Sequence, residues 1–381
     1  MNVNEKYHPI VEELVKMIAE NDWTDKFEQA IKKANTKNLP FLERVKNLNQ
    51  YLNWINDFLY WIPTENSTGQ NVDDHLSAFY FIADQEPILS LQNKIVPYNE
   101  MPPLTPFSQW LVNYANAMGL FLDSPESWTP ESEATFYSST AYNMKEYLKP
   151  RGGWKSFNQF FARNFKPGYR PTAAIADQTI IVSPVDATFG GVWEIRKDAN
   201  VTVKNLNWKI SELLESSPYK ECFEGGLFMH TYLGPTDYHR QHAPVGGKVL
   251  EARVIQGQVY LEVSAKTLVE ETGKHRIHHK RIYDSQDNTG YQFAQTRGLI
   301  VLDTPIGLVA ILPIGMCQVS SVIITAEVGV TLRKGEEISY FQFGGSDCIV
   351  LFQSAANICF SAQTGIHYKV GNKIAEAYCV I

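Results

Sequence analysis

The sequence has few cysteines, no paired cysteine motif and no long apolar run. Its five cysteines include no Cys-x-x-Cys pair, so neither a disulfide framework nor a structural zinc site is indicated. We expect free, buried thiols in a reducing compartment. The longest apolar stretch, residues 306–317, is interrupted by Pro313 and is too short to span a bilayer. Charges scattered through the first 20 residues exclude a signal peptide, so we expect a soluble, cytoplasmic protein.

Basic charge is also in short supply. Lysine and arginine number 34 against 41 aspartates and glutamates, which gives a net charge of −7. Non-specific nucleic-acid binding needs a basic surface, so we expect no nucleic-acid partner. The sequence also shows no basic amphipathic helix that would hold an anionic bilayer, so we do not favour membrane contact.

The composition that remains is that of an ordinary globular protein, with 44% hydrophobic and 20% charged residues. A chain of 381 residues is long for one core, so we expect two domains. Apolar residues at helical spacing predict helices in the first 150 residues, among them residues 41–62 and 106–122. The aromatic residues of the first of these could touch lipid, but we expect them in the core.

The pattern changes after Pro150. Short runs rich in β-branched residues, such as 299–302, 309–312 and 348–352, alternate with Gly, Pro, Asp and Asn. This pattern predicts an antiparallel β sandwich or barrel. We therefore predict an α+β protein with a helical N-terminal domain (residues 1–150) and a β-rich domain (residues 151–381). The boundary is expected between residues 150 and 175.

Acid, histidine and serine side chains concentrate in three short segments, residues 183–187, 234–244 and 343–347. Together these hold an aspartate, two histidines and a serine, the ingredients of an Asp-His-Ser arrangement. Each residue also has an ordinary structural interpretation, as a turn aspartate, a hydrogen-bonded histidine pair or a hairpin serine. The candidate site residues are Asp186, His239, His242 and Ser346.

The joint identity of these segments resembles the phosphatidylserine decarboxylase family, whose members cut themselves and make their own cofactor. Residues 344–346 (GGS) are similar to the family's Gly-x-Ser cleavage triplet, and residues 237–244 (DYHRQHAP) to its DYHRxHxP segment. Residues 157–171 resemble its FNxFFxR…RP segment. Residues 183–186 (SPVD) resemble its SPxDG motif, with Ala187 in place of the usual glycine. Four motifs in one order favour membership over chance.

The resemblance implies that the chain cleaves itself between Gly345 and Ser346. Two glycines before a serine let the backbone bring the hydroxyl to the preceding carbonyl, and His242, oriented by Asp186, is the candidate general base. The products would be a β chain (residues 1–345) and an α chain (residues 346–381) that begins with a pyruvoyl cofactor. This group would form a Schiff base with the substrate amine and draw electrons as carbon dioxide leaves. His239 is assigned to decarboxylation, although the two histidines could exchange roles.

The implied reaction removes the α-carboxylate of an L-amino-acid group. The family default is phosphatidylserine, which gives phosphatidylethanolamine. The acidic chain lacks a spanning segment, and residues 101–124 are similar to the N-terminal domain of soluble tryptophan decarboxylases. Our prediction therefore leans slightly toward a free aromatic amino acid such as tryptophan, with phosphatidylserine a close second. A homo-oligomer is also left open.

A function of another class remains compatible with the sequence. The protein could be an uncleaved serine hydrolase that uses Ser346, His242 and Asp186, or a non-catalytic binding protein. Asp347 follows the serine and departs from the commoner family pattern, which leaves slow or failed maturation open.

A metal site is not predicted. His275, His278 and His279 lie close together, but the lysines and arginines around them would repel a cation. We expect a solvated basic loop at residues 274–281.

Overall fold

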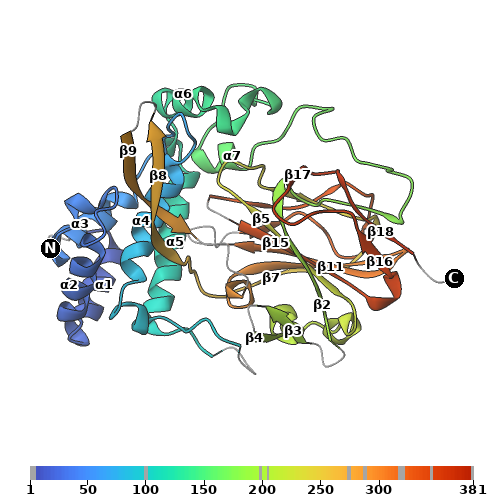
Figure 1. The fold of residues 1–381 in the computed structure, drawn as a ribbon, viewed down its shortest axis with the longest axis horizontal. Coiled ribbons are helices and arrows are strands. Elements are labelled where there is room, and N and C mark those ends of the chain that lie inside the picture. The colour runs from blue at the N-terminus through green and yellow to red at the C-terminus, as the bar shows by residue number, and fades with distance from the viewer. Residues whose placement is uncertain are drawn as a thin grey trace, which may run out of the picture.

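The computed structural model describes residues 6–97, 102–196, 200–203, 206–272, 276–285, 290–315, 322–343 and 346–378. Within these ranges, helices fill the N-terminal part and antiparallel strands dominate the C-terminal part. Figure 1 shows most of the helices gathered at one end of the molecule and most of the strands at the other. The predicted α+β class is confirmed.

The helices of the N-terminal region are short and separated by turns. They are α1 (Pro9–Glu20), α2 (Thr24–Asn35), α3 (Leu48–Phe58), α4 (Asn71–Ala83), α5 (Pro106–Asp123), α6 (Pro130–Ser138) and α7 (Phe157–Phe161). The helix predicted for residues 106–122 is therefore confirmed as α5. Its start is set by Thr105, whose hydroxyl accepts a hydrogen bond from the Ser108 N–H at 3.2 Å.

The single helix predicted for residues 41–62 is wrong, because the structure has two elements there. A 3-10 turn, η1 (Leu42–Arg44), precedes α3. The Asn47 side chain accepts a hydrogen bond from the Gln50 N–H at 2.9 Å and so fixes the start of α3. Tyr51 and Phe58 of α3 are buried, so these two aromatic residues lie in the core as expected.

The β region is built from one large sheet and several small ones. Its strands are β1 (Ile180–Val182), β2 (Ala187–Glu194), β3 (Asn200–Val203), β4 (Leu206–Lys209), β5 (Leu227–Leu233), β6 (Arg240–His242), β7 (Gly247–Ile255), β8 (Val263–Thr272), β9 (Arg276–Ser285), β10 (Arg297–Thr304), β11 (Gly307–Gly315), β12 (Val322–Ile324), β13 (Thr331–Leu332), β14 (Glu337–Phe341), β15 (Ser346–Phe352), β16 (Ile358–Phe360), β17 (His367–Tyr368) and β18 (Lys373–Ala377), with a helix α8 (Ile210–Leu214) after β4. The eight-stranded sheet has the order β13-β7-β10-β11-β15-β5-β2-β17, and three-stranded sheets β1-β18-β16 and β12-β14-β6 accompany it.

Both faces of the large sheet are buried at its inner strand β15. In β15, Cys348 and Val350 belong to an apolar cluster that continues into the helical region. Ile349 and Leu351 belong to a second cluster with Trp208 on the other face. Side chains alternate between the two faces of a strand, so β15 is apolar on both sides and lies in the interior, between β11 and β5.

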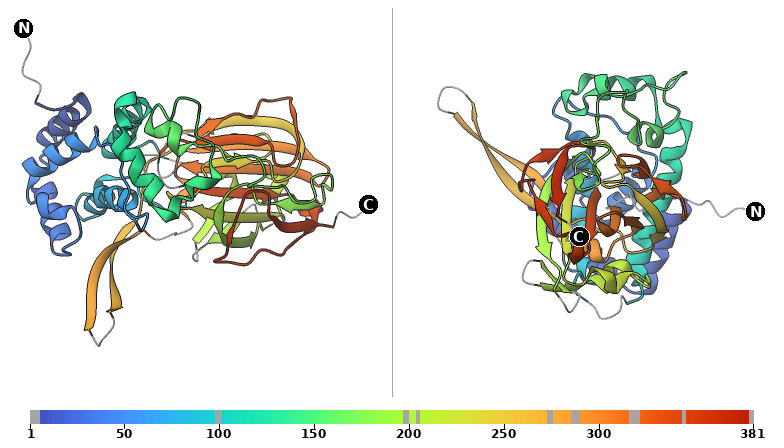
Figure 2. Two further views of the ribbon diagram at one scale, coloured as in Figure 1. Left: turned by 90° about the horizontal axis from the view of Figure 1, so that it is seen from above. Right: turned by 90° about the vertical axis from the view of Figure 1, so that its right-hand side faces the viewer.

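The basic segment at residues 274–281 is not a loop, as predicted, but is largely part of a β-hairpin. Strands β8 and β9 pair antiparallel from Val263↔Ser285 to Thr272↔Arg276. Figure 2 shows this hairpin projecting from the body of the molecule, and its strands contact α4. Residues 273–275, and so His275, lie outside the described residues. The β-branched residues of the two strands favour extended structure, which the charge pattern had obscured.

The cysteine prediction is confirmed only for Cys348, which is buried. Cys222 and Cys359 are free but exposed, so the expectation of buried thiols is wrong for these two. The other two cysteines lie outside the described residues. Within the described ranges, none of the helices has the length and apolar character needed to cross a membrane.

A buried lysine holds the segment that leads into β1. Lys334 is 2% exposed, and its ammonium group donates hydrogen bonds to the carbonyls of Ala174, Asp177 and Ile180. These three acceptors come from the chain immediately before the 183–186 motif. Lys334 therefore fixes that segment against the turn between β13 and β14.

We predict that Lys334→Met lowers the free energy of unfolding by about 1–3 kcal/mol, because it leaves buried carbonyl groups without donors. Urea unfolding followed by circular dichroism measures this loss. The adjacent exposed residue provides a matched control, since Arg333→Met removes the same charge without removing a buried donor. Equal losses in the two variants would contradict this role of Lys334.

Candidate active site

The predicted site residues converge near the last residue of β5, Leu233. Ser346, the first residue of β15, pairs with Leu233 on one side. Tyr232 pairs with Thr188 of β2 on the other side, two residues after Asp186. Strand β6 carries His242 and follows His239 directly, and Asp186 directly precedes β2.

Backbone hydrogen bonds bring the first two motifs together. The N–H of His242 donates to the carbonyl of Pro184 at 2.8 Å, and the N–H of Val182 donates to the carbonyl of Pro244 at 3.1 Å. The Ser183 hydroxyl donates to the Val185 carbonyl at 2.7 Å and closes the turn between them. The SPVD and DYHRQHAP segments therefore lie side by side.

Asp186 is committed to partners other than a histidine. Arg170 donates from Nε to both carboxylate oxygens at 2.9 Å and from a terminal nitrogen to Oδ2 at 2.5 Å. The N–H of Val370 donates to Oδ1 at 2.7 Å. Arg170 also pairs with Glu146 at 2.8 Å. Hydrogen bonds from Arg170 lower the pKa of Glu146 against the opposing effect of burial.

His242 is oriented by a backbone carbonyl, so the expectation that Asp186 orients it is wrong. Its Nδ1 lies 2.8 Å from the carbonyl oxygen of Gly335, which can only accept, so Nδ1 carries the proton. Its Nε2 lies 3.0 Å from the hydroxyl of Tyr238, which donates to it. Burial lowers the pKa of His242. The ring is therefore neutral near pH 7, with the lone pair on Nε2.

Glycine at position 335 is needed for this arrangement. Gly335 has φ +85°, and a Cβ there would come within 2.4 Å of the Thr172 hydroxyl oxygen. A side chain would therefore be strained and would collide with a neighbour. The carbonyl that holds His242 depends on that turn.

His239 is fully buried, and neither of its ring nitrogens makes a hydrogen bond of standard geometry, although the backbone of Gly234 and Asp237 lies near enough to favour the protonated ring. Its ring stacks on Phe161 with centroids 3.9 Å apart. Burial, and then the positive charge of Arg163, hold the pKa of His239 well below its ordinary value. A buried polar group without a partner is costly, and a role in catalysis is one of the reasons for which a native protein retains such a group.

Arg163 supports the loop before His239. It is fully buried, and one terminal nitrogen donates to the carbonyls of Thr236 and Asp237 at 2.8 and 3.0 Å. Its guanidinium group lies 4.2 Å from the centre of the Tyr147 ring. The arginine of the FNQFFAR segment therefore fixes the backbone of the DYHRQHAP segment.

The chain just before Ser346 is held by aromatic packing. The N–H of Phe343 donates to the side-chain oxygen of Asn158 at 3.0 Å, and its ring lies 5.6 Å from that of Phe161. On the helical side, the ring centroids of Trp61 and Phe343 are 6.0 Å apart. Gly344 and Gly345 lie outside the described residues, and only the backbone of Ser346 is described.

Comparison with known proteins decides what this arrangement belongs to. Residues 157–376, more than half of the chain, match the family model described as phosphatidylserine decarboxylase. The chain belongs to the phosphatidylserine decarboxylase family. The match begins at the first residue of α7 and covers the candidate site residues, whereas the helices before α7 lie outside it.

Two of the similar curated proteins carry the same family name, and a third is named only as a decarboxylase. The phosphatidylserine decarboxylase proenzyme of Fusobacterium nucleatum is 30% identical over 235 residues, which are 62% of this chain and 71% of that protein. The phosphatidylserine decarboxylase proenzyme 3 of Schizosaccharomyces pombe is 29% identical over 287 residues, 75% of this chain and 27% of that protein. The decarboxylase iboD of Amanita muscaria is 26% identical over 273 residues, 68% of this chain and 78% of that protein. The chain thus spans about a quarter of the Schizosaccharomyces relative.

Membership confirms the predicted family, and phosphatidylserine decarboxylases are carboxy-lyases. The tryptophan-decarboxylase-like branch stays a prediction. Sequence reasoning missed Tyr238, Arg163 and Arg170 as site residues, although all three lie inside the family segments it used. It could not have found the Gly335 carbonyl, because a backbone acceptor leaves no signal in the sequence.

Asp347, which departs from the commoner family pattern, is part of a buried polar cluster. It is fully buried, and its Oδ2 accepts a hydrogen bond from Gln292 at 2.6 Å and lies 3.2 Å from Nε2 of His230. The residue after Ser346 is therefore anchored by its own side chain. This cluster was not predicted.

No metal site emerges from the described residues, where no group of three or more histidine, cysteine or acidic side chains is arranged to hold an ion. The side chains of His278 and His279 are not among those described. The prediction that the protein needs no metal stays a prediction.

The neutral state of His239 predicts a pH dependence of stability. In the unfolded chain its pKa takes the ordinary value of 6.5, well above that in the folded chain. Between the two pKa values the unfolded state binds more protons than the folded state. The contribution of His239 to the free energy of unfolding is therefore fully present above about pH 6.5 and is lost as the pH falls. One such group contributes a slope of up to about 1.4 kcal/mol per pH unit.

Urea unfolding of wild type and His239→Asn, at a series of pH values from about 7.5 to 5.5, measures this slope. The variant should lose part of the acid sensitivity. His8→Asn, in the helical region, is the control and should retain it. Identical slopes for wild type and His239→Asn would show that His239 is not the group responsible.

Proposed function

We propose that this chain is a self-processing, pyruvoyl-dependent decarboxylase that removes the α-carboxylate of an L-amino-acid group. The observation that carries the proposal is the buried His239, whose ring nitrogens make no hydrogen bond of standard geometry. Its carbonyl accepts a hydrogen bond at 2.9 Å from the N–H of Phe341, five residues before Ser346. An uncommitted imidazole beside the predicted cleavage segment can bind a substrate carboxylate or move a proton.

In the proposed maturation, the Ser346 hydroxyl attacks the Gly345 carbonyl carbon. A C–O bond forms between the Ser346 oxygen and the Gly345 carbonyl carbon, and the C–N bond between the two residues breaks. Gly345 is then joined to Ser346 by an ester, and the amino group of residue 346 is free. His242 is suited to take the hydroxyl proton, because it is neutral and its lone pair is on Nε2. A base then removes the Cα proton of residue 346, and the bond between Cβ and the ester oxygen breaks, which frees the Gly345 carboxylate and leaves a dehydroalanine. Addition of water to its imine form with loss of ammonia leaves a pyruvoyl group on residue 346.

Tyr238 adds a step that the sequence did not suggest. Its hydroxyl is hydrogen-bonded to Nε2 of His242, the nitrogen that would accept the serine proton. The tyrosine must therefore either rotate away from Nε2 or relay the proton to it. Burial raises the pKa of Tyr238 and keeps the hydroxyl protonated. Tyr238 is therefore proposed to keep the lone pair of His242 directed and shielded until the serine reaches it.

The pairing of residue 346 supports the proposed cofactor position. Residue 346 begins β15, which is paired on both sides, with Leu233 of β5 and Gly315 of β11. Asp347 anchors the next residue through Gln292. A pyruvoyl group there would supply an electrophilic carbonyl that accepts the substrate amine and draws electrons from it. The chain's own contribution is to hold that position and to exclude water around His239.

Phosphatidylserine is the substrate we propose first, because curated relatives are named phosphatidylserine decarboxylase proenzymes. A free aromatic amino acid such as tryptophan is the second candidate. The observation that favours it is the ring contact between Trp61 of the helical region and Phe343 of the cleavage segment. Action in the cytoplasm and assembly into homo-oligomers stay predictions.

The uncleaved serine hydrolase has weaker support. A hydrolase triad needs the acid to hold the histidine, but Asp186 is bound to Arg170 and Val370. A protein that only binds its ligand does not account for the cleavage motif at residues 344–346, which the family model covers. We therefore prefer the decarboxylase.

Self-cleavage makes a direct prediction for two variants. Wild type should give two chains on a denaturing gel, residues 1–345 and 346–381. Ser346→Ala should give one, because no hydroxyl remains to attack. His242→Asn should slow cleavage by about 100-fold or more, the usual range for a lost general base. Ser354→Ala, an exposed serine of the same segment, is the control and should be cleaved normally. Fragments ending at Gly345 from Ser346→Ala would rule out the proposed nucleophile.

Carbon dioxide release distinguishes the substrates. Mature enzyme is given either vesicles that contain phosphatidylserine or L-tryptophan in buffer, and the gas is measured. We expect release from the vesicles, and loss of that release after treatment with a carbonyl reagent such as phenylhydrazine, which blocks an electrophilic cofactor. Release of carbon dioxide from tryptophan but not from the vesicles would show that tryptophan, and not phosphatidylserine, is the substrate. Release from neither, by fully cleaved protein, would overturn both.

A further inference from the structure

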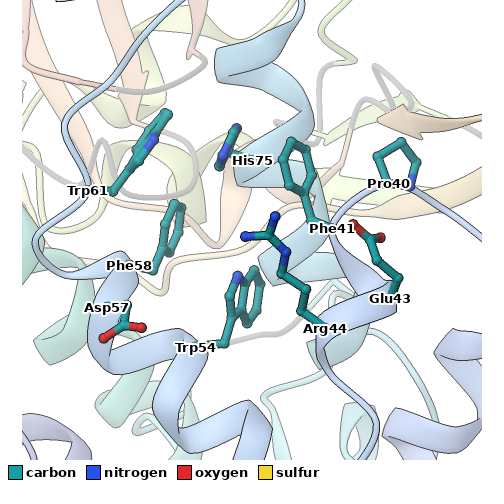
Figure 3. A pocket seen from close by; sticks show the side chains of 9 residues that line it. All are labelled: Pro40, Phe41, Glu43, Arg44, Trp54, Asp57, Phe58, Trp61 and His75. Atoms are coloured by element: carbon teal, nitrogen blue, oxygen red, sulfur yellow. The ribbon is translucent and has the colours of Figure 1, made fainter.

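An aromatic cleft opens in the helical region, between η1, α3 and α4. It encloses about 340 Å³, which is within the range of small-molecule sites. Figure 3 shows the side chains that line it, and we call it the Trp54 cleft. Its lining residues are Pro40, Phe41, Glu43, Arg44, Trp54, Asp57, Phe58, Trp61 and His75.

The walls of the cleft are aromatic faces. Trp54 stacks on Phe58 with an interplanar angle of 6°, and Trp61 stacks on His75 with centroids 4.6 Å apart. Both tryptophans remain partly exposed. Large apolar rings that face a concave space present a surface that a second flat ring would bury favourably.

Backbone strain is concentrated at the edge of this cleft. Phe41 has φ +68°, a left-handed conformation that is costly for a residue with a bulky side chain. Strain of this kind clusters at ligand-binding positions. The Phe41 ring lies 4.0 Å from that of His75. The turn that follows places Glu43 and Arg44 on the cleft.

Three charged side chains of the cleft have no protein partner. Among the residues that the structure describes, Glu43, Arg44 and Asp57 make no ion pair and no side-chain hydrogen bond. Figure 3 shows the guanidinium group of Arg44 directed in among the rings, with the carboxylates of Asp57 and Glu43 on opposite sides of it. One cation between two anions is complementary to a zwitterion, because Arg44 can pair with a carboxylate while an acid pairs with an ammonium group.

His75 does not compete with such a ligand. Its Nδ1 donates to the carbonyl of Asn71 at 2.8 Å, and burial lowers its pKa. The ring is therefore uncharged near pH 7 and does not repel an ammonium group. It provides an aromatic face and an acceptor nitrogen.

We propose that the Trp54 cleft binds a free aromatic α-amino acid as its zwitterion. The ring packs against the aromatic walls, the carboxylate pairs with Arg44, and the ammonium group faces Asp57. A decarboxylated amine would leave Arg44 unpaired, and a serine headgroup would leave the aromatic walls uncovered. If this ligand is also the substrate, the inference rests on the second candidate of the proposed function; the binding itself requires no self-cleavage.

Ring contacts connect the cleft to the cleavage segment. Trp61, which lines the cleft, contacts Phe343 at 6.0 Å. Phe343 contacts Phe161 at 5.6 Å, and Phe161 stacks on His239 at 3.9 Å. A ligand in the cleft is therefore separated from the proposed reaction centre by one continuous row of packed rings.

Isothermal titration calorimetry of full-length Ser346→Ala tests the proposal, because a chain without Ser346 can form no pyruvoyl group and turns nothing over. The probes are L-tryptophan, tryptamine and glycerophosphoserine. We expect tryptophan to bind, tryptamine to bind about tenfold more weakly for want of the carboxylate, and glycerophosphoserine to give no heat. Arg44→Gln should weaken tryptophan about tenfold and leave tryptamine unchanged.

Two further variants complete the test. Lys32→Gln removes a surface charge from the same region, outside the cleft, and should bind tryptophan normally. Asp57→Asn should weaken tryptophan and tryptamine alike. Absence of tryptophan binding, or equal tryptophan binding by the parent protein and Arg44→Gln, would overturn the proposal. Tryptophan binding by a wild-type protein that never cleaves would instead contradict the proposed function and leave the cleft assignment standing.

Discussion

The contacts of one buried guanidinium group set the arrangement of the site. Arg170, with 3% of its side chain exposed, pairs with Glu146 at the end of the helical region and with Asp186 at the start of β2. Asp186 in turn accepts the N–H of Val370, from the segment after the predicted cleavage point. Two carboxylates around one arginine are a stable buried arrangement only as a complete set. Three separate parts of the chain therefore depend on this ion network for their relative positions.

This network also explains why the acid and the histidines are independent. With both its oxygens occupied, Asp186 has no capacity left to hold an imidazole, and His242 takes its orientation from the Gly335 carbonyl instead. A neutral acceptor leaves the ring uncharged, whereas a buried carboxylate would favour its protonation. The site thus separates the task of holding the chain from the task of keeping a free base.

The sequence predicts those parts of the fold in which periodicity and burial agree. The helix predicted for residues 106–122 buries Phe107, Leu111 and Met118 in α5, and the apolar run at residues 348–352 is the core of β15. Prediction failed where a local contact decided the outcome. The hydrogen bond of the Asn47 side chain starts α3 and breaks the expected helix, and pairing with β8 makes a strand of a charged segment.

The residues of the candidate site were predictable from the sequence, but their hydrogen-bond partners were not. Family motifs located Asp186, His239 and His242, because motifs preserve residue types in order. They could not give the partner of each side chain, because partners such as Gly335 and Val370 act through backbone atoms. The Trp54 cleft was also outside their reach, since it joins residues from η1, α3 and α4 that follow no short pattern.

The position of β15 has a consequence for whether the cleaved protein could refold after unfolding. The strand lies inside the large sheet, and β18 lies between β1 and β16, so a cut before Ser346 would leave the short C-terminal piece interlocked with the rest. The two pieces would stay together without a covalent bond. Once such a molecule unfolded, however, renaturation would require two separate polypeptides to meet, and dilution would oppose it. Cleavage would thus make unfolding irreversible in practice. The lifetime of the cleaved protein would then be governed by its rate of unfolding.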